Sequence, residues 1–326
     1  MALSVFLSIG CATAANWFFL RFLVPSLRLR LLDRPNERSS HRQPTPRGAG
    51  VSFVLFSSAA SILGYLFQSS SVLDPSPLVA LPLLALPLSL VGFLDDCLNL
   101  PPSLRYIVHL ATAFALVFVS PQFAPSFGSL PLTLILMIVV TAVINFTNFM
   151  DGLDGLVAGC MAVGIAAIAI HLAAPWPTWS LVGALFGFLL WNWSPAKAFM
   201  GDVGSTFLGA FFAGLVLQAS SWPQAFAYVL VATPLLADAC LCVLRRLLAG
   251  QRVFQAHRLH LYQRLNQAGW SHAHVSLTYI TATVVLGSAM LTGGLPWVFC
   301  LAVLELLLGV WLDRRVAVQF SLASKS

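Results

Sequence analysis

Long apolar segments, separated by short polar connections, run through most of the chain and restrict what it can fold into. A helix of about 20 mostly apolar residues satisfies its own backbone hydrogen bonds and spans the hydrocarbon core of a bilayer. The chain is 59% hydrophobic and only 9% charged, whereas a soluble domain carries roughly 25% charged residues. We therefore expect an integral membrane protein with an all-α fold, built as a polytopic bundle of transmembrane helices.

The apolar segments predict about eleven spans. They cover residues 3–25, 50–69, 77–94, 104–120, 129–146, 155–173, 179–193, 205–219, 225–244, 275–292 and 296–312. The first lacks a basic leader and a cleavage site, so it is expected to be a span and not a signal peptide. Because no polar stretch is long enough for a soluble domain, residues 1–326 are expected to form a single integral-membrane domain.

The basic residues predict the orientation of the bundle. With eleven spans, all 17 Lys and Arg residues fall on one side of the membrane. By the positive-inside rule that side is the cytoplasm, which places the N-terminus outside and the C-terminus inside. The net charge of +6 therefore reports topology, and no nucleic acid partner is expected.

Five carboxylates lie at span ends on the same predicted cytoplasmic side. They are Asp95, Asp96, Asp151, Asp154 and Asp202. Carboxylate and amide oxygens suit hard cations such as Mg²⁺. Arginines and glycine-rich turns on that side suit a phosphoryl or pyrophosphoryl substrate. The combination predicts a metal-dependent site that faces the cytoplasm.

Each feature alone has a simpler explanation. Asp95 and Asp96 would serve as a solvated loop pair, and Asp202 as the N-cap of the eighth span. The arginines of residues 28–47 would serve topology or contact anionic lipid, and His272 would be an ordinary loop residue. The six cysteines form no CxxC pair and are expected to pack as small apolar residues. The convergence of five acids on one side favours a common site.

Four motifs in order, DD, NFTNFMDGLDGL, PAKAFMGDVGS and HRLHLYQRL, resemble the polyprenyl-phosphate N-acetylhexosamine-1-phosphate transferases. This family is related to phospho-MurNAc-pentapeptide translocase, and the resemblance spans roughly residues 33–265. It implies a helix bundle in the bacterial inner membrane with a cytoplasmic active-site cleft. It also implies transfer of a sugar-1-phosphate from a UDP-N-acetylhexosamine to a polyprenyl phosphate with release of UMP. Mg²⁺ is the implied cofactor, with Mn²⁺ as a substitute, and a homodimer is left open.

The resemblance implies a role for each matching residue. It implies metal ligation by Asn148 and Asp202 and catalytic positions for Asp95, Asp96 and Asp151, the first two of these near the lipid phosphate. It implies that Asp154 reads uracil. The remaining residues implied to bind substrate are His41, Arg42, Arg47, Asn192, His257, Arg258, His260 and Arg264.

Two departures from the family pattern bear on specificity. The glycine run after PTP reads Gly48-Ala49-Gly50, and HRLHLYQRL lacks the histidine triplet of the pentapeptide translocase. The second points to the branch that starts O-antigen and related envelope glycans, such as lipopolysaccharide, and leaves the sugar undefined. A membrane prenyltransferase would also use Asp-rich inner loops and Mg²⁺ but would leave FMGDVGS and HRLHLYQRL without a role. A transporter would place polar residues near mid-membrane.

Overall fold

Helices account for nearly all regular structure in the computed structural model of the protein. The structure describes residues 2–35, 43–67, 76–98, 100–123, 129–252 and 257–323. The helices are α1 (Ala2–Arg30), α2 (Val51–Leu66), α3 (Pro77–Leu98), α4 (Pro102–Phe118), α5 (Leu130–Phe149), α6 (Leu156–His171), α7 (Trp176–Asn192), α8 (Asp202–Val216), α9 (Trp222–Val231), α10 (Thr233–Leu248), α11 (Leu261–Gln267), α12 (His272–Arg315) and α13 (Phe320–Ala323). Two-residue strands β1 (Leu32–Asp33) and β2 (Thr45–Pro46) pair antiparallel, with Leu32 opposite Pro46. The predicted all-α fold class is confirmed.

The first eight predicted spans each fall on one helix, α1 to α8. Within the described residues, α1, α3, α5 and α12 are long and apolar enough to cross a bilayer, and a bent pair of helices would make a fifth span. Helices α2, α4, α6 and α8 are apolar but shorter, with 15 to 17 residues. The protein is a multi-pass membrane protein, and the count of eleven spans stays a prediction.

The ninth predicted span, 225–244, is divided between two helices. Helices α9 and α10 meet there at a bend of 83°. Pro234 lies in the first turn of α10, and because proline has no backbone N–H it cannot continue the hydrogen bonds of the preceding helix. The bend gives α10 a different direction from α9, so that its later residues reach the polar end of the bundle.

The two last predicted spans are also joined differently than expected. Helix α12 runs through both of them, and its helical geometry breaks only at Gly294, which has φ 63° and ψ −158°. This conformation is one that glycine adopts readily, and Pro296 follows two residues later. The residues between these two spans therefore form a kink inside one helix.

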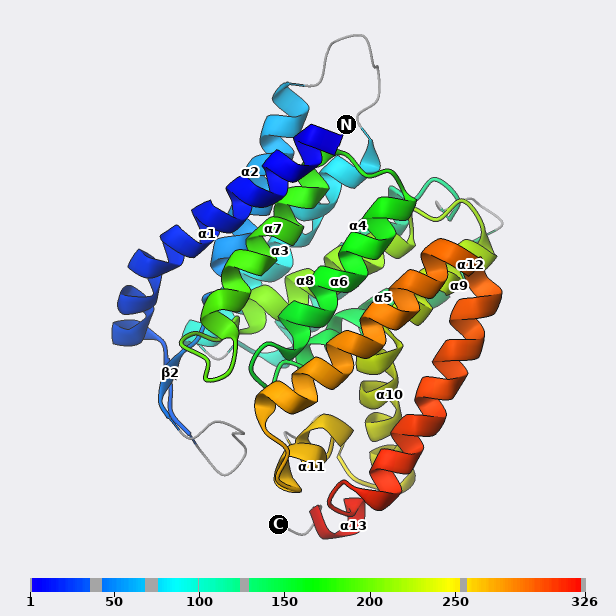
Figure 1. The fold of residues 1–326 in the computed structure, drawn as a ribbon. Coiled ribbons are helices and arrows are strands. Elements are labelled where there is room, and N and C mark those ends of the chain that lie inside the picture. Colours follow the sequence, from blue (N-terminus) through cyan, green and yellow to red (C-terminus); the bar gives the residue numbers. More distant parts are fainter. Residues whose placement is uncertain are drawn as a thin grey trace.

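The core of the bundle lies around α8. Every residue from 203 to 215 in this helix is buried, and α8 packs against α3, α5 and α6. Glycine allows one of these close approaches, because a Cβ on Gly209 would lie 2.7 Å from the Cα of Ile144 in α5. The N-terminus lies at one end of the bundle, while β2, α11 and α13 gather at the other (Figure 1).

Candidate active site

Backbone hydrogen bonds join the first loop to the segment before α8. The N–H of Phe199 donates to the carbonyl of Pro46 at 2.9 Å, and the N–H of Ala49 donates to the carbonyl of Phe199 at 3.0 Å. Gly50 likewise donates to Met200 at 3.0 Å. The two motifs PTPRGAG and PAKAFMGD thus form one unit, although about 150 residues separate them.

Glycines bring this unit close to the carboxylates. Gly48 and Gly201 have φ values of +87° and +70°, in the left-handed region that L side chains rarely adopt. A Cβ on Gly201 would overlap the carboxylate of Asp96. Ala49 has no positive φ, which explains why alanine replaces the middle glycine of the run without strain.

Asp95 and Asp96, adjacent in the last turns of α3, have different environments. Asp95 forms an ion pair with Arg105 of α4 at 2.6 Å and accepts a hydrogen bond from the N–H of Leu100 at 2.7 Å. One oxygen of Asp96 lies 3.0 Å from the guanidinium of Arg47. Its other oxygen, Oδ2, is buried and has no hydrogen-bond partner among the described residues. Asp96 therefore keeps an acceptor for a ligand, whereas both oxygens of Asp95 are occupied.

Asp151 lies among like charges in the turn between α5 and α6. Burial first, and then the negative charges of Asp202, Asp96 and Asp154, raise the pKa of Asp151 to about 8. Carboxylates that repel one another in a partly closed space form a natural site for a cation. Asp95 also raises the pKa of Asp96 and Asp202, so the structure brings together all five acids that the sequence singled out.

Asp202 and Asn148 supply further oxygens to this cluster. Asp202 is the first residue of α8, and the N-cap position belongs to Gly201, so the explanation of Asp202 as a helix cap is wrong. The side-chain oxygen of Asn148 accepts a hydrogen bond from the hydroxyl of Ser205 at 2.6 Å, which fixes the orientation of the amide. The oxygens of Asp96, Asn148 and Asp202 form a hard donor set of the kind that Mg²⁺ prefers.

A cavity of about 590 Å³ opens between α3, α4, α5 and α8, and we call it the α3–α8 cavity. One wall is apolar, with Leu88 and Val91 of α3. The polar residues that line it are Arg105, His109, Asn145, Asn148, Asp202, Thr206, His257, His260 and Gln263. The mixture suits a ligand that carries a phosphate on an apolar chain.

A second cavity, of about 700 Å³, contains Asp154 and is lined mostly by polar residues; we call it the Asp154 cavity. Oδ2 of Asp154 accepts a hydrogen bond from the N–H of Ala196 at 3.2 Å and lies 3.1 Å from Nδ1 of His272. Arg258 also lines this cavity. His272, expected to be an ordinary loop residue, is the first residue of α12 and a direct neighbour of Asp154.

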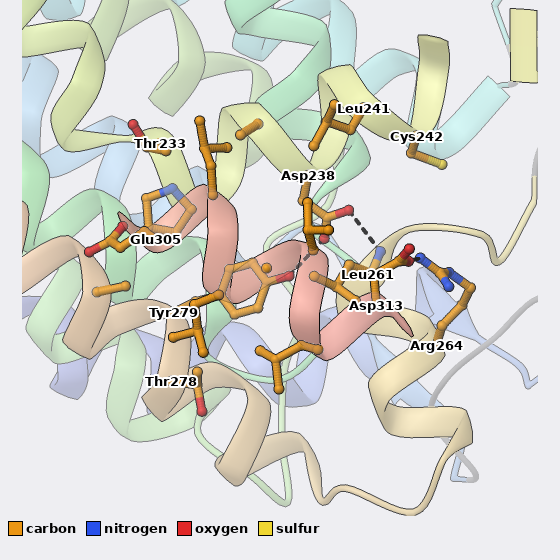
Figure 2. A pocket seen from close by; sticks show the side chains of 18 of the residues that line it. Thr233, Asp238, Leu241, Cys242, Leu261, Arg264, Thr278, Tyr279, Glu305 and Asp313 are labelled. Carbon is orange, nitrogen blue, oxygen red and sulfur yellow. Dashed lines mark hydrogen bonds and ion pairs between the residues drawn. The ribbon is translucent and has the colours of Figure 1, made fainter. Parts of the chain in front are cut away.

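The histidine segment before α11 is held by Asp238 of α10, a residue that the sequence analysis did not single out. Asp238 accepts hydrogen bonds from the N–H groups of Leu261 and Tyr262 at 2.7 and 3.0 Å. It also accepts from the hydroxyl of Tyr279 at 2.8 Å (Figure 2). An acid inside the apolar segment 225–244 was the signal that could have found it, since a buried charge in a span needs partners.

Arg264 and Asn192 are placed differently from the substrate contacts that the resemblance implied. The Arg264 side chain is buried, donates to the carbonyls of Leu259 and Val318, and pairs with Asp313. Asn192 accepts from the N–H of Gly155 at 3.0 Å and donates to the carbonyl of Ala198 at 2.9 Å. Both side chains connect loops of the site, and a substrate contact for either stays a prediction.

The other predicted substrate residues lie at the two cavities or near them. His257 and His260 line the α3–α8 cavity, and Arg258 lines the Asp154 cavity. Burial, together with the positive charges of His260 and Arg246, lowers the pKa of His257 to about 3, so its imidazole is neutral at physiological pH. The predicted residues His41 and Arg42 lie outside the described residues.

Comparison with known proteins agrees with this arrangement of motifs. The sequence pattern of "Glycosyl transferase family 4" matches residues 78–220. A "Probable undecaprenyl-phosphate N-acetylglucosaminyl 1-phosphate transferase" of Bacillus subtilis is 25% identical, over 85% of this chain and 83% of its own length. A "Decaprenyl-phosphate N-acetylglucosaminephosphotransferase" of Mycobacterium leprae is 30% identical, over 82% of this chain and 79% of its own. A "Phospho-N-acetylmuramoyl-pentapeptide-transferase" of Desulforudis audaxviator is 31% identical, over 78% and 86%.

Proposed function

Because the chain belongs to the polyprenyl-phosphate N-acetylhexosamine-1-phosphate transferases of glycosyl transferase family 4, we propose that it transfers an N-acetylhexosamine-1-phosphate from a UDP-sugar to a polyprenyl phosphate. UMP is the second product. The observation that carries the proposal is the acid cluster around Asp151, with the unpartnered Oδ2 of Asp96 inside it. Neither a prenyltransferase nor a transporter gives the joined PTPRGAG and PAKAFMGD segments a role.

The residues present fit a Mg²⁺ ion, with Mn²⁺ as a substitute. The proposed ligands are Asn148 and Asp202, and the buried carboxylate of Asp96 lies close enough to Asp202 to be repelled by it. Bound there, Mg²⁺ would neutralise charge on the diphosphate and on the departing UMP. Ser205 orients Asn148 for this role through its 2.6 Å hydrogen bond.

The two cavities suit the two substrates. In this proposal the lipid phosphate enters the α3–α8 cavity, where Leu88 and Val91 meet the polyprenyl chain and Arg105 lies near the phosphate. The nucleotide occupies the Asp154 cavity, and the carboxylate of Asp154 accepts a hydrogen bond from the uracil N–H. Arg258 lines that cavity and donates to phosphate oxygens. The negative charges of Asp154 and Asp202 both raise the pKa of Asp151. In this proposal Asp151 therefore lies between the two substrates.

The chemical step is a direct displacement. An oxygen of the lipid phosphate attacks the β-phosphorus of the UDP-sugar, a new P–O bond forms, and the bond from the β-phosphorus to the bridging oxygen breaks to release UMP. A phosphate monoester has a second pKa of about 6, so the attacking group is already largely a dianion at neutral pH. Of the two adjacent acids, Asp96 orients the lipid phosphate. Asp95 holds Arg105 in place through its 2.6 Å ion pair.

The sugar is proposed to be a UDP-N-acetylhexosamine without a peptide, because HRLHLYQRL lacks the histidine triplet. The product would then be the first lipid-linked intermediate of O-antigen or another envelope glycan. The basic residues further support an enzyme of the bacterial inner membrane whose cavities face the cytoplasm.

A direct assay tests the proposal. Purified protein in detergent receives polyprenyl phosphate, Mg²⁺ and one of UDP-GlcNAc, UDP-GalNAc or UDP-MurNAc-pentapeptide, and UMP release is measured. We expect release with at least one of the first two sugars and none without lipid or with a chelator. Absence of release from all three donors would refute the proposal.

The mechanism is tested by exchange of labelled UMP into UDP-sugar. A covalent aspartyl sugar-phosphate would allow this exchange without lipid acceptor, whereas direct displacement does not. We expect no exchange in delipidated enzyme whose residual polyprenyl phosphate has been quantified. Lipid-independent exchange that disappears in Asp96→Asn would establish the covalent route instead.

A further inference from the structure

Among the described residues, one group of His, Cys, Asp or Glu side chains has the spacing of a metal site, and it lies outside the acid cluster and does not include its carboxylates. The ligand atoms of Cys242, His257 and His260 all lie within 4.8 Å of one another. Cys242 lies on α10, and the two histidines belong to the segment that precedes α11. Cys242 and His260 are almost fully buried, with 4% and 2% of their surfaces exposed.

Asp238 lies directly behind this group. It is one helical turn before Cys242 on α10, and residues four apart share a helix face (Figure 2). Its Oδ1 is 3.8 Å from Nδ1 of His260. A carboxylate behind a histidine is the usual support for a metal-bound imidazole. Asp238 would then support His260 through Nδ1, which leaves Nε2 of that ring for the metal.

The position of His257 also suits a metal ligand, because it lines the α3–α8 cavity beside His260. Its Nδ1 accepts a long hydrogen bond of 3.3 Å from the N–H of Leu259, a bond that a metal could replace. The rings of His257 and His260 are 4.9 Å apart, centroid to centroid.

The geometry points to an inhibitory site for a borderline or soft divalent cation, with Zn²⁺ as the class, formed by Cys242, His257 and His260. The thiol of Cys242 would give its proton to solvent as the sulfur–metal bond forms. Sulfur and imidazole ligands favour Zn²⁺ over Mg²⁺, so this site and the oxygen-rich cluster at Asp202 would select different metals. Three protein ligands leave a fourth position for water.

Inhibition follows from the position of the two histidines. Both line the α3–α8 cavity together with Asn148 and Asp202. A bound cation would fix both rings and occupy their lone pairs, which removes them from contact with substrate. This part of the inference rests on the proposed transferase function, whereas the binding of the cation does not.

Binding is tested with Cd²⁺, whose bond to a thiolate gives an ultraviolet charge-transfer band. Purified full-length protein in detergent is titrated with Cd²⁺ in excess Mg²⁺, and the wild type is compared with Cys242→Ser and Cys240→Ser. Cys240 is the matched control, because it lies two residues earlier on the same helix. We expect Cys242→Ser to lose one equivalent of the band and Cys240→Ser to lose none. Equal bands in the wild type and Cys242→Ser would overturn the site.

Inhibition is tested separately on UMP release. Traces of Zn²⁺ should inhibit the wild type in the presence of excess Mg²⁺. Cys242→Ser should keep the basal rate and need about tenfold or more Zn²⁺ for the same inhibition, while Cys240→Ser should behave as the wild type. Cd²⁺ binding at Cys242 without Zn²⁺ inhibition would overturn the inhibitory role. The charge-transfer band tests the site even in a protein that proves to have no transferase activity.

Discussion

Replacing Asp238 with Asn tests whether one carboxylate on α10 holds the histidine segment of the site. Its Oδ1 accepts a hydrogen bond from Leu261, and its Oδ2 accepts from Tyr262 and Tyr279. An amide has a single acceptor oxygen. If that oxygen takes the place of Oδ2, the NH₂ group faces the backbone N–H of Leu261. The hydrogen bond from Leu261 is then lost, and two donors, its N–H and the NH₂ group, face each other without an acceptor.

The magnitude follows from these contacts. A hydrogen bond to a charged group contributes about 1.5–3 kcal/mol, and a buried unsatisfied donor costs about 1–3 kcal/mol. The two values describe the same broken contact and are not summed. We therefore expect Asp238→Asn to lower the free energy of local opening around α11 by about 2–4 kcal/mol. That change corresponds to roughly 30- to 900-fold more frequent opening.

Hydrogen–deuterium exchange of the amides in residues 257–267 measures this opening, and UMP release from the same samples measures its consequence. Tyr279→Phe is the matched control, because it removes one hydrogen bond to Asp238 and leaves both backbone bonds. We expect fast exchange and low turnover in Asp238→Asn and near-normal values in the control. Equal exchange in the two variants would refute the anchoring role of Asp238.

Three further changes probe the acid cluster. Asp202→Asn should lower turnover more than about 100-fold without loss of thermal stability, since mutation of residues that only support a metal ligand already lowers activity 10–100-fold. Near-normal turnover with unchanged Mg²⁺ dependence would exclude Asp202 as a ligand. Gly201→Ala should cost about 1–3 kcal/mol, because Gly201 has φ 70° and ψ 178°, a conformation essentially restricted to glycine. It should also reduce activity by displacing Asp96, while Ala49→Gly leaves activity unchanged. An active Gly201→Ala variant of normal stability would contradict the crowding at Asp96. In metal-free enzyme, Asp151 with its pKa of about 8 keeps a proton that the unfolded chain loses near pH 4, so stability should fall as the pH rises from about 4 to about 8. Asp151→Asn should flatten that slope in thermal unfolding scans, and a slope equal to that of the wild type would count against the buried acid.

The sequence by itself determined the class of fold and the end of the bundle where the chemistry lies. Apolar segments of span length leave a helix bundle as nearly the only solution in a bilayer. The cost of burying charge directs the carboxylates to helix ends, and in the structure Asp96, Asp154 and Asp202 all lie close enough to Asp151 to raise its pKa. These inferences succeed because they depend on local composition and on the solvent, and not on which helices touch.

Only the tertiary structure decided which of these polar groups is free to bind a ligand. Adjacent in sequence, Asp95 and Asp96 look alike, and they differ only because Arg105 reaches the first while the second keeps an unpartnered oxygen. Arg264 resembles a substrate contact by motif, yet its donors are taken by the protein itself. The bend before α10 brings Asp238 to the N–H groups of Leu261 and Tyr262. Each of these outcomes depends on packing between helices distant in sequence, and because a hydrogen bond needs its two atoms within about 3 Å, residue type and spacing along the chain do not determine it.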